Sequence, residues 1–233
     1  MRIAEIYRSL QGEGLLAGTP SVFVRTSGCN LRCRWCDTPF TSWEPVGEDM
    51  TVQDIVAAVE ACRRRHVVVT GGEPLLFTET IDLCDLLRRR GHHVTVETAG
   101  TIVPRGASHG FADLISISPK LASSGPPAET PGDWASRHEA ARRRDDVLTT
   151  LMHNAAWQLK FVIDTPADLA DAVSWLDDLG IDAAAGAVFM MPQGVDAQDL
   201  ALTSGWLAEA CGRHGFRFAP RHHIDWFGHA RGT

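Results

Sequence analysis

The chain has 233 residues, with 22 Lys and Arg against 29 Asp and Glu, so its formal net charge is −7. Hydrophobic residues make up 44% and charged residues 22%, which is usual for a globular protein and excludes a disordered chain. The acidic balance disfavours a dedicated nucleic-acid binder, and the sequence contains no apolar run long enough for a membrane span. Glu5 also stands where a signal peptide needs an apolar residue. We expect a single domain over residues 1–233 with no nucleic-acid or membrane partner and no targeting segment.

Strand and helix patterns alternate along the first half of the chain. The segment Arg2–Tyr7 and the β-branched run Pro20–Ser27 predict two strands, and an irregular loop over residues 28–47 follows them. The patterns beyond this loop predict a helix from Thr51 to about Arg65, a strand Val67–Thr70, a helix Thr78–Arg90, and strands His92–Thr98 and Asp113–Ser118.

The second half continues the alternation after a variable segment at residues 121–153, where we expect a flexible loop and then one charged helix ending near His153. The remaining patterns predict a strand Trp157–Ile163, a helix Pro166–Leu179, a strand Gly186–Met191, a helix Ala197–His214 and a last strand Phe216–Ala219.

This order predicts an α/β fold whose strands are mainly parallel and joined by right-handed crossovers. Because the chain is shorter than the roughly 250 residues of a complete barrel, we expect an incomplete, TIM-like β/α barrel of about six parallel strands, or an open doubly wound sheet. Functional residues in both architectures gather beyond the carboxyl ends of the strands. The unusual motifs fall at that edge: Cys29, Gly71-Gly72-Glu73-Pro74, Glu97-Thr98 and Ser118-Pro119-Lys120.

Three of the six cysteines form the most informative motif, Cys29-x3-Cys33-x2-Cys36. Three thiolates on a short loop can hold three corners of an iron–sulfur cube and leave the fourth iron free for another ligand. A structural zinc site, in contrast, usually has four protein ligands, so a zinc interpretation needs a distant His as the fourth. The clustering also indicates a reducing compartment, and we expect a cytoplasmic protein.

The cysteine motif, with Trp35 before its last Cys and Gly-Gly-Glu-Pro at residues 71–74, resembles the radical S-adenosylmethionine superfamily. The resemblance implies a [4Fe-4S] cluster on Cys29, Cys33 and Cys36, whose open iron binds the methionine part of S-adenosylmethionine. An electron from the cluster then cleaves the sulfonium and yields a 5′-deoxyadenosyl radical. The electron donor implied is a protein like flavodoxin or ferredoxin.

Further motifs narrow the resemblance to the 7-carboxy-7-deazaguanine synthases: Ser9–Gly14, Arg25, Cys36-Asp37-Thr38 and Ser118-Pro119-Lys120. The similarity covers most of the chain and is tightest in residues 5–40 and 67–120. It implies a homodimeric lyase of queuosine and 7-deazapurine biosynthesis, which converts 6-carboxy-5,6,7,8-tetrahydropterin to 7-carboxy-7-deazaguanine with loss of ammonia. The radical would remove hydrogen from C6, and the ring would then contract.

The same resemblance implies roles for single residues, and no catalytic side chain beyond the cofactor-bound radical. Thr38 would bind a Mg²⁺ ion, which prefers hard oxygen ligands. The substrate would be bound by Leu10, Gln11, Gly12, Glu13, Arg25, Thr70, Glu97 and His223. The cofactor would be contacted by Trp35, Cys36, Asp37, Gly72, Ser118, Pro119, Lys120, Met190, Met191, Pro192 and Gln193. The tail departs from the family pattern, because Ile224 follows His223 where a basic residue is common.

Two other functions share part of this pattern. A glycyl-radical-enzyme activase would carry the cysteine motif and Gly-Gly-Glu-Pro but has no need of Gln11–Glu13 or Thr38. A non-catalytic iron–sulfur or zinc protein would bind metal without binding or cleaving S-adenosylmethionine. The motifs at Gln11–Glu13 and Asp37-Thr38 favour the synthase.

Overall fold

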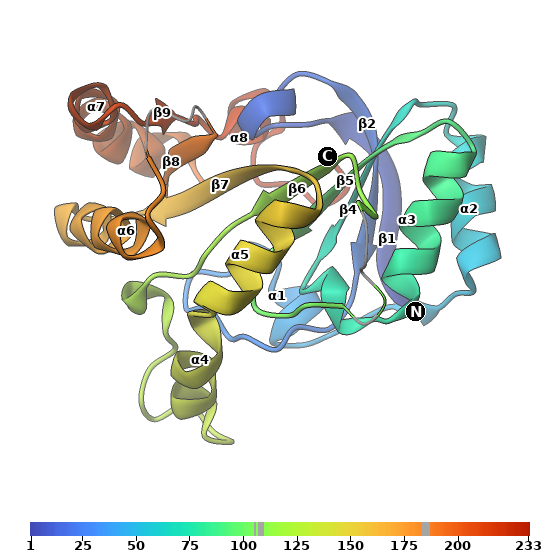
Figure 1. Cartoon of the computed structure of the whole chain (residues 1–233), viewed down its shortest axis with the longest axis horizontal. Helices are drawn as coiled ribbons and strands as arrows, with labels where there is room; N and C mark the ends of the chain where they lie inside the picture. The colour runs from blue at the N-terminus through green and yellow to red at the C-terminus, as the bar shows by residue number, and fades with distance from the viewer. Residues whose placement is uncertain (105, 107–109, 183–186) are drawn as a thin grey trace.

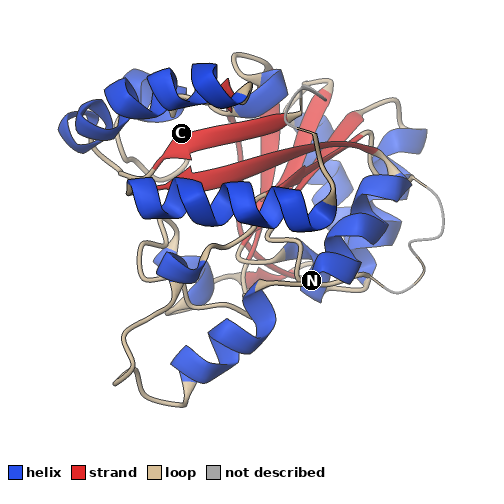
Figure 2. Ribbon diagram, turned by 60° about the vertical axis from the view of Figure 1, so that its left-hand side comes forward, coloured by secondary structure: helices blue, strands red, loops and turns tan. Residues whose placement is uncertain are grey.

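The computed structural model describes residues 1–104, 106, 110–182 and 187–233. Within these residues the strands are β1 (Arg2–Leu10), β2 (Pro20–Thr26), β3 (Glu48–Asp49), β4 (His66–Gly71), β5 (His93–Thr98), β6 (Leu114–Ile117), β7 (Ala156–Ile163), β8 (Val188–Pro192) and β9 (Arg217–Phe218). They form one sheet in the order β3-β1-β2-β4-β5-β6-β7-β8-β9. The sheet is curved but not closed, as Figures 1 and 2 show.

The helices of the described residues are α1 (Pro39–Ser42), α2 (Val52–Ala61), α3 (Glu79–Arg89), α4 (Trp134–Arg142), α5 (Asp145–Asn154), α6 (Pro166–Leu179), α7 (Ala197–His214) and α8 (His222–Phe227). Short 3-10 turns lie at Gly14–Leu16 (η1), Pro74–Leu76 (η2) and Ala122–Ser124 (η3). Across this part of the chain, none of the helices has the length and apolar character needed to cross a membrane.

Strand β2 and strands β4 to β9 are parallel neighbours, which confirms the predicted α/β fold with an incomplete barrel. β1 is different, because it pairs antiparallel with both β2 and β3. Residues 11–19, between β1 and β2, are too few for the crossover that two parallel strands require. The sheet therefore begins with a hairpin edge that the strand–helix alternation does not predict.

Each strand alternates two kinds of side chain, because successive residues point to opposite faces. One face carries aliphatic side chains such as Val22, Val67 and Ile115, which share a core with apolar side chains of α2, α3, α5, α6 and α7. Figure 2 shows these helices along the outside of the curved sheet. The opposite face carries polar side chains, among them Glu97 and Lys160, which line a cavity. The alternation thus separates the core from the candidate site.

The single charged helix predicted up to His153 is wrong, because two helices, α4 and α5, occupy this segment. Arg143 and Arg144 between them have non-helical backbone angles. Their guanidinium groups pair with Asp145 and Asp146 in the first turn of α5. Acidic side chains there favour a helix start because they complement its partial positive charge, so the chain breaks one helix and starts another.

Three other segments differ from the prediction. The loop over residues 28–47 is not wholly irregular, since Pro39 starts the short helix α1. The helix after Thr51 ends at Ala61 rather than near Arg65, because Arg63 has a left-handed φ of 53°. Helix α8 was not predicted. The bounds of α6 and α7 are as predicted, whereas the predicted strand start at Gly186 lies outside the described residues.

Candidate functional site

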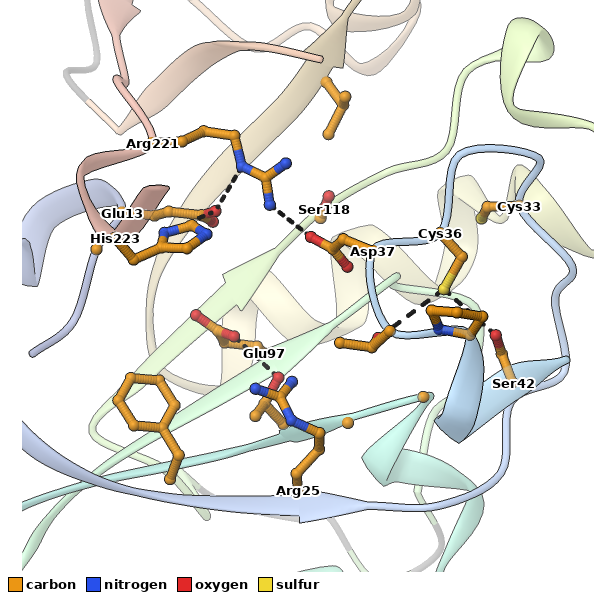
Figure 3. Close-up of a pocket in the computed structure, with 18 of the residues that line it drawn as sticks. Glu13, Arg25, Cys33, Cys36, Asp37, Ser42, Glu97, Ser118, Arg221 and His223 are labelled. Carbon is orange, nitrogen blue, oxygen red and sulfur yellow. Dashed lines mark hydrogen bonds and ion pairs between the residues drawn. The ribbon is translucent and has the colours of Figure 1, made fainter. Parts of the chain in front are cut away.

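A cavity of about 470 Å³ opens at the carboxyl ends of the parallel strands. Nearly all the residues predicted from the sequence for substrate, cofactor and metal line it: Leu10, Gln11, Gly12, Glu13, Arg25, Cys29, Cys33, Trp35, Cys36, Asp37, Thr38, Thr70, Gly72, Glu97, Ser118, Lys120, Met191, Gln193 and His223. Figure 3 shows ten of the lining residues with labels, facing one another from several strands and loops.

Three predicted cofactor residues are not among those that line the cavity: Pro119, Met190 and Pro192. All three are buried, and the side chain of Met190 packs in the hydrophobic core. A cofactor in the cavity would therefore meet the backbone of this part of β8 rather than the Met190 thioether. The cofactor contacts predicted for Pro119, Met190 and Pro192 stay predictions.

The cysteine loop is tied to the sheet by backbone hydrogen bonds at its start. Gly28 N–H donates to Thr41 O at 2.8 Å, and Glu73 N–H donates to Gly28 O at 2.8 Å. Further along, Cys36 Sγ lies 3.3 Å from Ser42 Oγ (Figure 3). The loop that carries Cys29, Cys33 and Cys36 is therefore anchored to α1 and to the Gly-Gly-Glu-Pro segment.

The three thiols fit the cluster that the motif predicts. Burial raises the pKa of Cys29 to about 12 and that of Cys33 to about 11, so these thiolates need a neighbouring cation. The irons of a cluster would supply that charge. Among the described residues, no group of three or more His, Cys, Asp or Glu converges closely enough to hold a single metal ion. In a cubane cluster each thiolate binds a different iron, so three thiolates on one loop can hold three of its corners.

The two glycines at the end of β4, Gly71 and Gly72, are required by close packing within the chain. A Cβ on Gly71, whose φ is 138°, would lie 2.2 Å from Thr26 O, and one on Gly72 would lie 2.2 Å from Gly28 O. Glu73 is fully buried, and its carboxylate accepts hydrogen bonds from Thr98 Oγ1 and Ala99 N, both at 2.8 Å. The Glu73 side chain thus joins β4 to β5, outside the set of cavity-lining residues.

A network of charges crosses the other end of the cavity (Figure 3). Lys160 of β7 is 4% exposed, and its Nζ lies 2.7 Å from Glu13 Oε2 and 3.6 Å from Glu97 Oε1. Arg221 contacts Glu13 Oε1 at 3.4 Å and also pairs with Asp37. Burial by itself raises the pKa of Glu13, but Lys160 and Arg221 outweigh it and hold that pKa well below its usual range. Glu13 is therefore ionised.

Two neutral side chains complete this network. Gln11 Nε2 donates to Glu97 Oε1 at 3.1 Å, and Thr70 Oγ1 donates to Glu97 Oε2 at 2.9 Å. Gln11 Oε1 accepts from the backbone N–H of Glu13 at 3.2 Å. His223 Nδ1 lies 3.8 Å from Glu13 Oε1. The predicted substrate residues from β4, β5 and the segment after β1 are thus brought together.

Arg25 belongs to a second ionic group near the edge of the sheet. Its Nε contacts Glu5 Oε1 at 2.7 Å, and Nη2 donates to Tyr7 Oη at 2.5 Å. Arg231, from the chain's C-terminal segment, contacts the other Glu5 oxygen at 2.8 Å. The Arg25 guanidinium is therefore oriented by two neighbours on β1 while it lines the cavity.

Four of these cavity residues have no predicted site role: Glu5, Tyr7, Lys160 and Arg231. Lys160 had a detectable signal, because it is the one charged residue of a predicted strand that is otherwise apolar except for Gln158. Arg221, two residues before His223, has no predicted role either. Arg231 carried no such signal, since the position of the C-terminal segment depends on how the chain folds back onto β1.

The cysteine loop on an open, mainly parallel sheet defines a radical S-adenosylmethionine enzyme, and residues 23–120 match the Radical SAM superfamily. A 7-carboxy-7-deazaguanine synthase from Rhodopirellula baltica is 44% identical over 99% of this chain and 88% of its own length. One from Halobacterium salinarum is 47% identical over 95% of this chain and 88% of its own length. This chain belongs to the 7-carboxy-7-deazaguanine synthase family.

A solved structure agrees on the fold. A crystal structure of QueE from Escherichia coli aligns with a TM-score of 0.67 at 24% identity, over 95% of this chain and 94% of that one. The family membership sets aside both the activase and the purely metal-binding interpretations. It also implies a [4Fe-4S] cluster and S-adenosylmethionine as cofactors.

Proposed function

We propose that this enzyme converts 6-carboxy-5,6,7,8-tetrahydropterin to 7-carboxy-7-deazaguanine and ammonia, a step toward queuosine and related 7-deazapurines. One observation carries the proposal: a single cavity has the cysteine loop at one end and the network around Glu13 and Glu97 at the other. The product is the substrate less one ammonia, so the overall conversion is redox-neutral and the cofactor can act catalytically.

Cys29, Cys33 and Cys36 would hold the cluster, which together with S-adenosylmethionine supplies the one-electron chemistry that generates a carbon radical. The cofactor's contacts are assigned to the wall beside the loop. There Lys120 Nζ donates to Ser118 Oγ at 2.7 Å and lies 5.9 Å from the centre of the Trp35 ring. The other cofactor contacts are assigned to Asp37, Gly72, Met191 and Gln193, which line the same cavity, and to the neighbouring backbone of Pro119, Met190 and Pro192.

The pterin is assigned to the opposite end. Its aminopyrimidinone edge presents N–H donors, and ionised carboxylates are pure acceptors. Glu13 and Glu97 would accept those donors, and the buried Lys160 ammonium pairs with both carboxylates. Gln11 and Thr70 fix the orientation of Glu97 before substrate arrives. Leu10, Gly12 and His223, which also line the cavity, complete the assigned contacts.

The carboxylate of the substrate is assigned to Arg25. A guanidinium has five N–H donors and binds a carboxylate through two parallel hydrogen bonds. Glu5 and Tyr7 hold the Arg25 guanidinium in place from the β1 side. Arg25 would thus set which end of the pterin points toward the cysteine loop.

Thr38 is assigned as the protein ligand of a Mg²⁺ ion that bridges to the substrate. It is the residue before α1, and its hydroxyl accepts from Thr41 Oγ1 at 3.3 Å. Mg²⁺ keeps several waters and needs few protein oxygens, so one hydroxyl with substrate oxygens makes a plausible shell. The supporting observation is that Thr38 lines the cavity next to Cys36.

The remaining assignments concern the setting of the enzyme. All six cysteines are free thiols, which supports a reducing, cytoplasmic environment. We assign the electron supply to a flavodoxin- or ferredoxin-like protein, and the working form to a homodimer. Size measurement in solution and reduction assays with each donor test these two assignments directly.

An anaerobic assay tests the proposed reaction. The cluster is reconstituted, reductant, Mg²⁺, S-adenosylmethionine and the carboxytetrahydropterin are added, and mass spectrometry follows loss of ammonia from the substrate. We expect product with all components, and little product when Mg²⁺ is omitted or Thr38 is changed to Ala. Cys29→Ala should be folded, colourless and inactive, whereas Cys62→Ala, on the far end of α2, should stay active. Cofactor cleavage at the normal rate by Cys29→Ala would refute the proposal.

A further inference from the structure

The segment that carries η3 and α4 does not pack over the sheet like the other helices. Figure 1 shows α4 at the lower edge of the molecule, below α5. The segment contacts the cysteine loop at residues 32–34, which surround Cys33, and η3 also meets α6 through Ala122 and Asp171. The assigned cofactor and substrate roles do not use this segment.

A fully buried histidine of α4 binds the cysteine loop directly. The backbone N–H of Arg32 donates to His138 Nδ1 at 3.1 Å. His138 Nε2 lies 2.9 Å from Ser124 Oγ, and the Ser124 hydroxyl donates to Leu121 O at 2.6 Å. Because Nδ1 accepts and the hydroxyl proton is already used, Nε2 must carry the imidazole proton and donate to Ser124. One neutral tautomer of His138 therefore satisfies every hydrogen bond in the series from Arg32 to Leu121.

The backbone around Cys33 is held from three sides. Besides the Arg32 amide bound by His138, the Arg34 N–H donates to Ser124 O at 3.0 Å. The carbonyl of Cys33 accepts from Trp43 Nε1 at 3.1 Å. The Leu31–Arg32 peptide group is thus held by α4, and the Cys33–Arg34 peptide group is held by η3 and by the residue after α1.

The Arg32 side chain ties the same loop to α4 a second time. Its Nη1 donates to Cys29 O at 2.9 Å and to Leu31 O at 2.8 Å. Its guanidinium carbon lies 3.8 Å from the centre of the Trp134 ring, in cation–π contact. Trp134 is the first residue of α4, so the helix contacts the loop at its start and again at His138.

We propose that His138 and Ser124 are positioning residues for the cluster: they fix the Arg32 and Arg34 amides and thereby the direction of the Cys33 thiol. Burial lowers the pKa of His138 to about 4, which agrees with a neutral ring at pH 7. The inference concerns how the cysteine loop is held, so it does not depend on which substrate the enzyme uses.

Three substitutions at one position separate this role from simple packing. In His138→Asn the amide oxygen stands near the place of Nδ1 and can still accept from Arg32 N–H. In His138→Gln the amide reaches the place of Nε2 and retains only the Ser124 contact. His138→Phe keeps the ring volume and removes both bonds. Leu151→Ala is the control. Leu151 is a buried core residue of α5, the helix that follows α4 along the chain.

Each protein is reconstituted without oxygen, and three quantities are measured: thermal unfolding, the rate of iron loss to a chelator, and the paramagnetic resonance spectrum of the reduced cluster. We expect His138→Phe and His138→Gln to lose iron roughly tenfold faster, in line with other residues that orient metal ligands. Their spectra should also shift. His138→Asn should remain close to the unaltered protein, and Leu151→Ala should unfold earlier with a normal spectrum and normal iron retention.

The proposal is overturned if His138→Phe retains iron as long as the unaltered protein and gives the same spectrum. It is also overturned if iron loss in all four variants simply follows their thermal stability, because His138 would then only support the fold. If His138→Phe cannot be isolated, the comparison of His138→Asn with His138→Gln decides whether His138 acts through the Arg32 amide. Equal behaviour of these two would contradict a role through the Arg32 amide.

Discussion

Lys160 shows how much of the site depends on one side chain. It lies buried between Glu13 and Glu97, at 2.7 and 3.6 Å from their nearest oxygens. Removing one partner of a buried ion pair leaves an uncompensated charge, which typically costs about 3–5 kcal/mol. The cavity's polar end is therefore stable only as a set of matched charges.

We predict that Lys160→Met lowers the free energy of unfolding by about 3–5 kcal/mol and raises KM for the pterin. The double variant Lys160→Met, Glu13→Gln should recover part of the stability, because it removes the stranded negative charge as well. Urea unfolding of the unaltered protein, the two single variants and the double variant measures the coupling. Strictly additive effects would show that the two groups do not interact.

The ionised state of Glu13 also predicts a pH dependence. Its pKa is lower in the folded protein than the value of about 4.3 in an unfolded chain. Its contribution to stability is therefore fully present above about pH 4.3 and is lost as the pH falls toward the folded pKa. Between pH 6 and pH 3.5 we expect the unaltered protein to lose more unfolding free energy than Glu13→Gln. Parallel pH profiles of the two proteins would contradict the assignment.

At the scale of elements, the junction between β4 and the cysteine loop leaves no room for a side chain. A Cβ at Gly72 would lie 2.2 Å from the carbonyl oxygen of Gly28, the residue just before Cys29. A backbone atom cannot rotate away as a side chain can. The close approach of these two segments thus sets where the loop leaves the sheet.

We predict that Gly72→Ala lowers the unfolding free energy by about 1–3 kcal/mol, the usual cost of overpacking, and reduces the iron bound on reconstitution. Gly212→Ala is the matched control, since a Cβ at this position of α7 meets open space. It should raise stability by about 0.5–1 kcal/mol, because alanine is the better helix former. Iron content unchanged in Gly72→Ala would show that the loop tolerates displacement.

The elements that were predicted correctly are those whose ends are encoded locally. Helix α6 starts at a capping box of Thr165 and Asp168 and ends at Gly180, whose φ is 64°. The break between α4 and α5 was not predicted, because it depends on which carboxylates Arg143 and Arg144 reach. The antiparallel direction of β1 likewise depends on a tertiary pairing rather than on its own alternation.

The candidate site follows the same rule. The motifs after β2, β4, β5 and β6 could be placed on one rim, because the carboxyl ends of parallel strands share an edge. Lys160 could not be placed there, since it meets Glu13 only because the sheet curves until β7 faces the segment after β1. The His138 contact with Arg32 joins residues 106 positions apart, a separation that no local pattern encodes.

Considered as a whole molecule, the chain folds back so that its last residues meet its first strand. Residues 229–233 line the cavity, His229 contacts the backbone oxygen of Asp37 at 3.1 Å, and Arg231 pairs with Glu5 at 2.8 Å. Glu5 in turn holds Arg25. The C-terminal segment therefore supports the residue assigned to the substrate carboxylate.

We predict that Arg231→Ala raises KM for the pterin several-fold while the unfolding free energy changes by less than about 1 kcal/mol, as for other exposed ion pairs. Arg213→Ala, which breaks an exposed pair with Glu209 on α7, is the control and should change neither quantity appreciably. Steady-state kinetics with varied pterin and urea unfolding give both values. Equal KM values for the two variants would show that the C-terminal segment does not contribute to pterin binding.

The central claim is that the cofactor's 5′ carbon and the bound pterin meet in this one cavity. The most direct measurement uses carboxytetrahydropterin that carries deuterium at C6, with the reconstituted enzyme, reductant, Mg²⁺ and S-adenosylmethionine. We predict that deuterium appears at the 5′ carbon of the adenosyl group while 7-carboxy-7-deazaguanine and ammonia form. Formation of the product with an adenosyl group that stays free of deuterium, or cofactor cleavage with no change in the pterin, would contradict the account.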